Sequence, residues 1–313
     1  MKKVRKKIEV WLFRVAAWFV PRMPRRLVVA AARGFGWLFF MLPTRLKRIG
    51  QANLDVAFGD TKTTIEKKAI LLESFQTVFL TLLDVFWFSH DPYARVPRYV
   101  TFDPTLQVLF QKKKQVCITA HMGNWELLGH AVSVSGFPLS SVAAPLVNPA
   151  VEPLFCRLRE ASGQIIIPQQ GAIRALIKTL REDGKAAMLL DQNLAPYKGG
   201  VFLPFFSLPV PVSDAPASLA IRTGSDILFG FCVPDRQGNY TVVTRPKIVP
   251  PSLEQSADKS TAYRELTHQI LAVIEDVIRE HPGAWVWMYK RWKFIPESSD
   301  GTEYPFYGVR SKK

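Results

Sequence analysis

The sequence predicts an α/β protein: a three-layer αβα sandwich with a mixed β-sheet, preceded by membrane-associated helices at the N-terminus. Two observations lead to this prediction. From about residue 51 onward, short apolar runs alternate with segments of helical periodicity, which is typical of alternating strands and helices. Before that point, apolar runs are interspersed with thirteen Lys or Arg residues and a single acid, Glu9. We therefore expect a basic, apolar membrane-anchoring segment at 1–50 and one folded domain at 51–313.

The composition is that of a folded protein with a positively charged end. Apolar residues make up 48% of the 313 residues and aromatic residues 12%, which is enough for a sizeable core. Most of the net charge of +15 lies in the first fifty residues. A nucleic-acid-binding protein usually carries its basic patch on the folded domain, so we expect an anionic membrane, and no nucleic acid, as the partner of this segment. The three cysteines form no CxxC motif, which indicates a reduced compartment without a zinc site.

The anchoring segment contains two apolar runs, at 10–20 and 27–42. Neither reaches the roughly 20 residues that cross a bilayer core. Each also has an arginine near its middle, Arg14 or Arg33, which is costly deep in hydrocarbon. Basic clusters before, between and after the runs favour two helices in the cytoplasmic leaflet, or a shallow hairpin, over a true span. A signal peptide is the alternative, but the sequence after the first run offers a poor cleavage site.

The folded domain is expected to contain six helices and six strands, each identified from its periodicity. The first helix should start at a capping box formed by Thr63 and Glu66, and its second half is apolar on nearly all sides. The helices are predicted at 63–88, 124–135, 148–162, 171–183, 215–224 and 261–281, and the strands at 115–120, 139–144, 163–168, 186–191, 226–233 and 239–245.

His121 and Glu126 interrupt an otherwise apolar stretch, 116–132. On one continuous helix their side chains would point about 140° apart. Gly123 and Asn124 allow another arrangement, in which the strand ends at His121 and a helix begins at Asn124, a good N-cap. Glu126 would then lie in the first helical turn and reach back to the imidazole. In sheets of this kind, ligands bind at such loops beyond the carboxyl ends of the strands.

The pair has a direct chemical use. Neutral imidazole can take a proton from an alcohol as the alcohol attacks a carbonyl, while the carboxylate holds the tautomer and stabilises the imidazolium. The sequence has no GxSxG motif, so we expect His121 to act on the acceptor hydroxyl directly. The alternative is a structural histidine bonded to a nearby acid. His90, His130 and His268 are expected to be structural, and His281 to lie at a helix C-terminus.

Four blocks, in order, resemble one family. "HMGNWE" at 121–126 resembles the His-x4-acid motif of the lysophospholipid acyltransferase superfamily, in the form found in the lipid A late acyltransferases (lauroyl/myristoyl transferases). The stretches 168–193, 199–224 and 281–293 are similar to further blocks of that family. The resemblance extends from residue 1 to about 296 and implies a glycerolipid-acyltransferase-like fold for 51–313. One departure is Ala144, which stands where an arginine is usual.

The resemblance implies further site residues. Gly123 and Asn124 belong to the first block, and Arg157 and Arg159 match a basic block that helps to hold the oxyanion or an acceptor phosphate. An arginine there could stabilise a tetrahedral intermediate, although both residues could instead lie on a solvated helix face. Asp191 and Gln192 end a predicted strand and either face the pocket or cap the next turn. Arg291 is expected to bind substrate, although its block could be a strand with alternate aromatic residues packed inward.

The same resemblance implies an acyl-acyl carrier protein donor and a glycolipid acceptor, a lipid A precursor, on the cytoplasmic side of the inner membrane. Basic stretches at 112–114 and 290–293 are candidates for docking the acidic carrier protein. We expect no metal ion and no cofactor. Three alternatives remain: acylation of an aminolipid or mannosylated phosphatidylinositol, acylation of a lysophospholipid, for which Ala120 stands where asparagine is usual, and a non-catalytic membrane protein of the same fold. Acyl chain length and the acceptor hydroxyl are not predicted.

Overall fold

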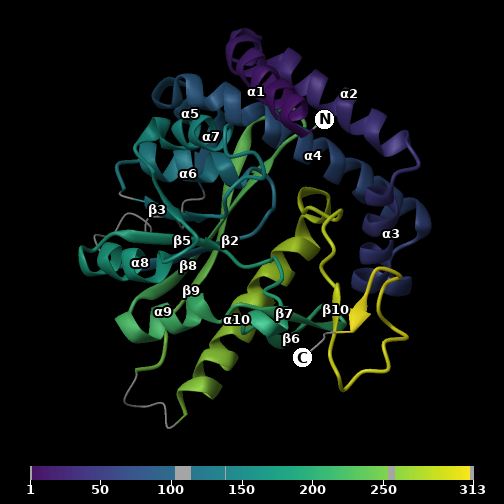
Figure 1. Cartoon of the computed structure of the whole chain (residues 1–313), viewed down its shortest axis with the longest axis vertical. Helices are drawn as coiled ribbons and strands as arrows, with labels where there is room; N and C mark the ends of the chain where they lie inside the picture. Colours follow the sequence, from purple (N-terminus) through teal and green to yellow (C-terminus); the bar gives the residue numbers. More distant parts are fainter. Residues whose placement is uncertain (1, 103–113, 138, 253–257, 311–313) are drawn as a thin grey trace.

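A seven-stranded mixed sheet runs through the protein in the order β1-β9-β8-β2-β5-β3-β4. Figure 1 labels its strands β2, β3, β5, β8 and β9. This computed structural model describes residues 2–102, 114–137, 139–252 and 258–310. The strands are β1 (Val100–Phe102), β2 (Gln115–Thr119), β3 (Leu139–Ala143), β4 (Ile165–Pro168), β5 (Lys185–Leu189), β8 (Asp226–Pro234) and β9 (Tyr240–Ile248). All neighbouring pairs are parallel except β8 and β9. The predicted α/β class and mixed sheet are therefore confirmed, as are all six predicted strands.

The sequence did not predict a second, smaller sheet. Strands β6 (Val201–Phe205) and β7 (Leu208–Val212) pair antiparallel outside the main sheet. Their stretch contains three prolines, which cannot donate to a strand ladder and normally argue against strands. A two-stranded ribbon tolerates them, since Pro204 pairs with Pro209 in the register. A last short pair joins β10 (Phe294–Ile295) to β11 (Val309–Arg310).

The predicted helices are all found, with small shifts of their ends. They are α4 (Thr64–His90), α6 (Trp125–Val134), α7 (Glu152–Arg159), α8 (Ala172–Arg181), α9 (Ala215–Thr223) and α10 (Lys259–Glu280), and α5 (Pro92–Tyr99) was not predicted. The capping box at the start of α4 is present, with the Glu66 N–H donating to Thr63 Oγ1 at 3.2 Å. Helix α6 contacts β8 and β3, while α8 contacts β3, β4 and β5 and α9 contacts β2. The three-layer sandwich remains a prediction.

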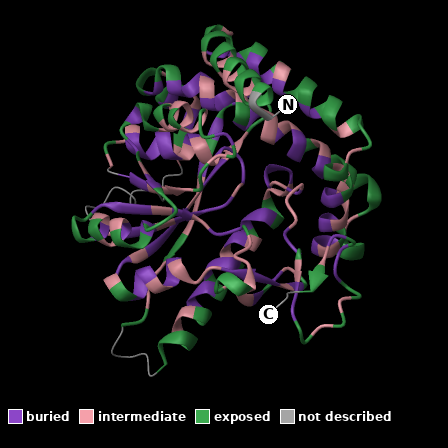
Figure 2. Cartoon of the chain, in the orientation of Figure 1, coloured by how far each residue is buried: buried purple, intermediate pink, exposed green. Residues whose placement is uncertain are grey.

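The N-terminal helices pack onto the rest of the chain. They are α1 (Lys2–Phe19), α2 (Arg25–Met41) and α3 (Arg45–Phe58), of which α3 was not predicted. One face of α2 packs along α4, and Val28, Val29 and Ala32 share a hydrophobic core with α4, β8 and β9. The opposite faces of α1 and α2 are exposed (Figure 2). The expected anchoring segment is therefore also part of the packed structure.

Only α4, among the described residues, is a single helix long and apolar enough to cross a membrane. Half of the residues in its apolar window are buried inside the protein. Helices α2 and α3 reach the required length only as a pair, and they meet at 87°. The length and composition of these helices are therefore weak support for a membrane-spanning segment.

Candidate active site

The turn that carries His121 is built as the sequence predicted. Strand β2 ends at Thr119, and α6 begins after Asn124, whose side-chain oxygen accepts from the Leu127 N–H at 2.9 Å. Gly123 has a φ of +57°, and a Cβ there would lie 2.0 Å from the carbonyl oxygen of Cys232. Only glycine fits this close approach between the turn and β8. His121 is thereby placed at the carboxyl end of a central strand.

A buried carboxylate, Asp191, lies against the imidazole of His121. Asp191 follows β5, which is the parallel neighbour of β2, so both residues lie at the same edge of the sheet. Asp191 Oδ1 is 2.8 Å from His121 Nδ1, and Asp191 Oδ2 accepts from the His121 backbone N–H at 2.9 Å. Ionised Asp191 can only accept, so Nδ1 carries the proton. His121 Nε2 is then an acceptor, 3.2 Å from Gln192 Nε2.

The surroundings of this pair shift the pKa values of both groups. Burial opposes protonation of His121, but the Asp191 carboxylate and its hydrogen bond raise the pKa of His121 above its ordinary value. Burial likewise opposes the charge on Asp191, yet the imidazole and the indole N–H of Trp285 hold its pKa below the usual value. The pair is therefore suited to stabilise an imidazolium that forms during a reaction.

The predicted contact between Glu126 and His121 is wrong. Glu126 lies in the first turn of α6, as expected, but its carboxylate binds Arg159 of α7. Arg159 Nε donates to Glu126 Oε2 at 2.7 Å and Arg159 Nη2 donates to Oε1 at 2.6 Å. The rigid guanidinium fork satisfies both carboxylate oxygens, so this pairing is preferred over a single bond to an imidazole.

Trp285 and Trp125 were not identified as site residues from the sequence. Trp285 Nε1 donates to Asp191 Oδ2 at 2.9 Å, which fixes the carboxylate that holds His121. Trp125 packs against the imidazole with a ring-centroid distance of 5.0 Å, and its Nε1 donates to Glu126 at 3.1 Å. Trp285 lies within 281–293, one of the four stretches that resemble the family, and this resemblance was the signal that could have identified Trp285 as a site residue.

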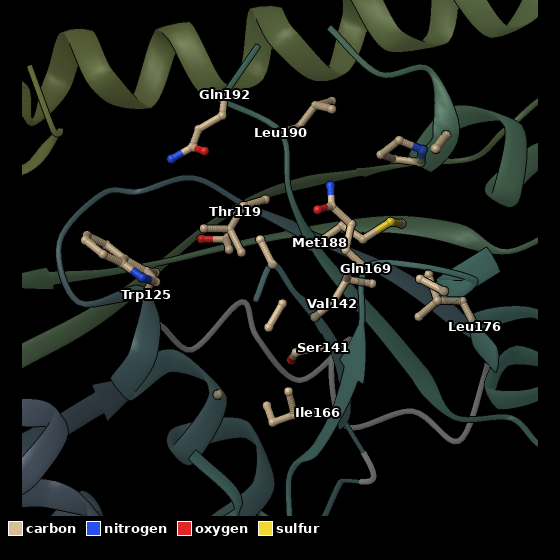
Figure 3. Close-up of a pocket in the computed structure, with 18 of the residues that line it drawn as sticks. Thr119, Trp125, Ser141, Val142, Ile166, Gln169, Leu176, Met188, Leu190 and Gln192 are labelled. Carbon is tan, nitrogen blue, oxygen red and sulfur yellow. The ribbon is translucent and has the colours of Figure 1, made fainter. Parts of the chain in front are cut away.

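A cavity of about 550 Å³ opens beside His121. Figure 3 shows Trp125 and Gln192 on one side of it and Leu176 on the other. Its lining is mainly apolar and includes Leu128, Val142, Ile166, Leu176, Met188 and Leu190, together with polar side chains such as Glu126, Arg159, Gln164, Gln169 and Gln192. Ala144 also lines it. The mixture suits a ligand with a long apolar part and a polar reacting end.

The other predicted site residues fall in different places. Asn124 is fully buried and shapes the turn with Gly123, so neither lines the cavity. Arg157 is exposed on α7, as the solvated-face alternative expected. Arg291 is fully buried, stacks on Phe205 and donates to Asn193 Oδ1 at 3.1 Å. Arg291 is not among the residues that line the cavity next to His121, and its role in binding substrate stays a prediction.

The remaining expectations concern basic stretches and histidines. Within 290–293 only the lysines are accessible, while residues 112 and 113 lie outside the described residues. His130 is structural, as predicted: its ring nitrogens contact Ser162 Oγ at 2.8 Å and Ser89 Oγ at 3.1 Å. Burial lowers the pKa of His130 to about 4. His281 follows the last residue of α10, also as predicted.

Comparison with known proteins gives the family. Residues 1–294 match the family described as bacterial lipid A biosynthesis acyltransferase. The phosphatidylinositol mannoside acyltransferase of Mycobacterium tuberculosis (strain CDC 1551 / Oshkosh) is 24% identical over 177 residues, which cover 55% of this chain and 52% of the relative. The protein of the same name from Mycolicibacterium smegmatis is 25% identical over 184 residues, covering 58% and 56%. The matches thus span about half the length of these curated relatives. Because the family match extends over nearly the whole sequence, the chain belongs to the bacterial lipid A biosynthesis acyltransferase family.

Proposed function

We propose that the chain is an O-acyltransferase that moves a fatty acyl group from acyl-acyl carrier protein to a hydroxyl of a membrane glycolipid, with a lipid A precursor as the first candidate. The observation that carries the proposal is His121, which Asp191 holds in the lining of a mainly apolar cavity. Membership in the family supports acyl transfer as the reaction class.

In the proposed mechanism His121 is the general base. Nε2 takes the proton of the acceptor hydroxyl as the hydroxyl oxygen attacks the thioester carbonyl. Asp191 stabilises the imidazolium and keeps the proton on Nδ1. The tetrahedral intermediate then collapses, the carbon–sulfur bond breaks, and the imidazolium returns the proton to the leaving thiolate. The products are an ester and the free thiol of the carrier protein.

Arg159 is the cationic side chain that we assign to the developing oxyanion. It lines the cavity, and two of the five N–H donors of its guanidinium bind Glu126. Its remaining donors can stabilise negative charge on the carbonyl oxygen. In this arrangement Glu126 is a positioning residue, because it acts by holding Arg159.

The cavity is the proposed binding site of the acyl chain. Its apolar lining would exclude water from the chain, and each buried methylene contributes about 0.8 kcal/mol. Leu176 lies on the side away from Trp125, so it is the candidate for limiting chain length (Figure 3).

The exposed faces of α1 and α2 are the proposed contact with the cytoplasmic leaflet of the inner membrane. Trp11 is 62% exposed and Trp18 61%, and both lie on α1, while Trp37 of α2 is 53% exposed. Exposed aromatic side chains interspersed with lysine and arginine are typical of helices that lie in the interface of an anionic membrane.

The acceptor has a second candidate, supported by the names of the relatives. The curated proteins that match are phosphatidylinositol mannoside acyltransferases, so a mannosylated phosphatidylinositol is the alternative to a lipid A precursor. Ala144 at the cavity, in place of the usual arginine, also favours testing an acceptor outside the lipid A pathway. The presence of His121 and Asp191 in contact argues against a non-catalytic protein.

The test uses the full chain in anionic vesicles with dodecanoyl-acyl carrier protein as donor. A lipid A precursor and a phosphatidylinositol mannoside are supplied in parallel, and release of carrier-protein thiol and formation of acylated lipid are both measured. We expect one acceptor to be acylated and His121→Ala to lower turnover to about 1% or less, since base catalysis contributes about 10²- to 10⁴-fold. A folded His121→Ala protein with near-normal turnover would overturn the proposal.

A further inference from the structure

A buried charged network links α2 to the turn that carries His121. Its members are Arg25 of α2, Asp84 of α4, Asn124 of the turn and Tyr240 of β9. Arg25 is 7% exposed, Asp84 1% and Asn124 0%. The mechanism above uses none of these groups, and burial of an ion pair is costly. The network therefore calls for an explanation.

The guanidinium of Arg25 is held on all its polar edges. It forms a bidentate pair with Asp84, in which Nη1 donates to Oδ1 and Nη2 donates to Oδ2 at 3.1 Å. Nε and Nη2 also donate to the carbonyl oxygen of Gly238, at 3.2 and 2.5 Å. The guanidinium carbon lies 5.0 Å from the ring centroid of Trp87 and 5.1 Å from that of Phe88. An arginine fixed this fully fixes its carboxylate partner as well.

Asp84 passes this constraint to the active-site turn. Its Oδ2 accepts from Asn124 Nδ2 at 3.3 Å and from the Tyr240 hydroxyl at 2.6 Å. The same side chain of Asn124 caps α6, and its backbone N–H donates to Cys232 at 2.7 Å. One turn before Asp84 on α4, the Thr81 hydroxyl donates to the carbonyl oxygen of Gly123 at 2.9 Å. Helix α4 thus holds two consecutive residues of the turn.

We propose that Arg25 is a positioning residue of the active site, which acts through Asp84 and Asn124 to fix the turn that aims His121 at the acceptor. This inference rests on the proposed function. Arg25 belongs to the same segment as the exposed apolar faces of α1 and α2, so one helix contributes both a membrane-facing surface and a constraint on the catalytic turn. The network residues do not line the cavity, so substrate binding does not depend on them directly.

A purely structural role gives a different expectation. If Arg25 only compensates the charge of Asp84, its loss should lower stability and leave kcat per folded molecule unchanged. A displacement of about 1 Å at a catalytic group can cost about 100-fold in rate, so the positioning role predicts a lower kcat at constant KM.

The experiment compares three variants of the full chain in anionic vesicles with the acceptor that becomes acylated in the first assay. Arg25→Met should lower kcat about 10- to 100-fold, with KM for dodecanoyl-acyl carrier protein unchanged. Arg25→Met combined with Asp84→Asn removes both buried charges and so protects folding; we expect the same low kcat, since the amide that replaces the carboxylate would lack its anchor on α2. Arg26→Met is the matched control, because Arg26 is the exposed neighbour on the same helical turn; its kcat should stay within about twofold of the parent.

Folding is checked by circular dichroism, and His121→Ala is assayed alongside. A folded double variant with parental kcat would overturn the inference while leaving the proposed function intact, provided His121→Ala is inactive. An active His121→Ala protein would instead refute the proposed function. An equal loss of kcat in Arg26→Met would also overturn the inference, because it would assign the effect to charge at the membrane.

Discussion

Replacing Asp191 by asparagine tests the revised site most directly. Asp191 accepts three hydrogen bonds, from His121 Nδ1, the His121 backbone and Trp285 Nε1, each between 2.8 and 2.9 Å. Asparagine has nearly the same shape but offers one oxygen and one NH₂ group. If the NH₂ group faces His121 Nδ1, the ring must carry its proton on Nε2, where it cannot act as a base.

The expected loss follows from that tautomer change. In a serine-protease triad the same substitution lowers kcat about 10⁴-fold while the geometry is preserved. Here the Trp285 indole N–H also requires an acceptor, which orients the amide oxygen of the introduced asparagine toward Trp285 and its NH₂ group toward the ring. We therefore expect a loss of about 10³- to 10⁴-fold in kcat, with KM for the donor changed little.

Glu126→Gln is the matched comparison, because it removes the carboxylate of the His-x4-acid motif. The carboxylate of Glu126 accepts two hydrogen bonds from Arg159, from Nη2 at 2.6 Å and from Nε at 2.7 Å. The introduced glutamine could still accept one of these two bonds. Loss of one oxyanion-stabilising donor typically costs about 10²- to 10³-fold. Partial loosening of Arg159 should cost less, about 10- to 100-fold.

The assay is steady-state release of carrier-protein thiol across a pH series. Removal of the Asp191 charge removes the main influence that raises the pKa of His121, so the acid limb of kcat/KM should move to lower pH in Asp191→Asn. Glu126→Gln should lower kcat/KM as well, but it should move the acid limb less than Asp191→Asn does. A Glu126→Gln protein that loses more activity than Asp191→Asn would refute this assignment and restore Glu126 as the partner of His121.

Three further predictions follow from the same geometry. In the parent protein kcat/KM should rise with pH and level off above the pKa of His121, which Asp191 raises above the ordinary value of histidine, because His121 must be neutral to act as a base; a kcat/KM that falls as the pH rises through this pKa would contradict this. Leu176→Ala should increase kcat/KM for longer acyl chains by about fourfold for each added methylene that fits into the enlarged cavity, measured with donors of increasing chain length. Leu180→Ala should not change this preference, because Leu180 is buried on the same helix but does not line the cavity. Trp11→Glu with Trp18→Glu should weaken binding to anionic vesicles at least about tenfold in a flotation assay, because each exposed ring loses about 1.5–3 kcal/mol of burial in the membrane interface; unchanged flotation would exclude α1 as the contact.

The centre of the main sheet could be predicted because its parallel strands β2 and β5 are largely buried. Such strands appear in a sequence as short continuous apolar runs, and all six runs identified became strands. The β6–β7 ribbon could not be predicted in this way, because its prolines normally exclude a strand. Strand β1 has three residues and pairs only at an edge, which leaves too short a pattern to detect.

The candidate site was predicted in part. The turn at His121 followed from local rules, namely the end of an apolar strand, a glycine and an N-capping asparagine. The carboxylate that binds the imidazole could not be predicted from local rules. Asp191 is 70 residues from His121 in the sequence and becomes its neighbour only through the pairing of β2 with β5. The spacing of the His-x4-acid motif predicted Glu126 as the partner of His121. The pairing of β2 with β5 instead brings Asp191 to the imidazole.

The buried arginines show a similar limit. The excess of basic residues in 1–50 led to the prediction that its arginines face the membrane. Arg26 is exposed, as this prediction requires. Arg25, its direct neighbour, is instead buried against Asp84, 59 residues away. Adjacent positions on a helix point about 100° apart, so one faces the core and the other the surface. Nothing in the local sequence distinguishes the two.

The two acids near His121 divide the electrostatic work of the proposed reaction. An attacking hydroxyl creates positive charge on the imidazole and negative charge on the carbonyl oxygen at the same time. Asp191 is hydrogen-bonded to the imidazole, and Glu126 holds Arg159 at the cavity where the oxyanion would form. Each developing charge would therefore meet a group of opposite sign that is already fixed, which lowers the reorganisation needed during the reaction. In the proposed reaction Asp191 would therefore serve the imidazole and Glu126 would serve Arg159, so that each developing charge has its own fixed partner.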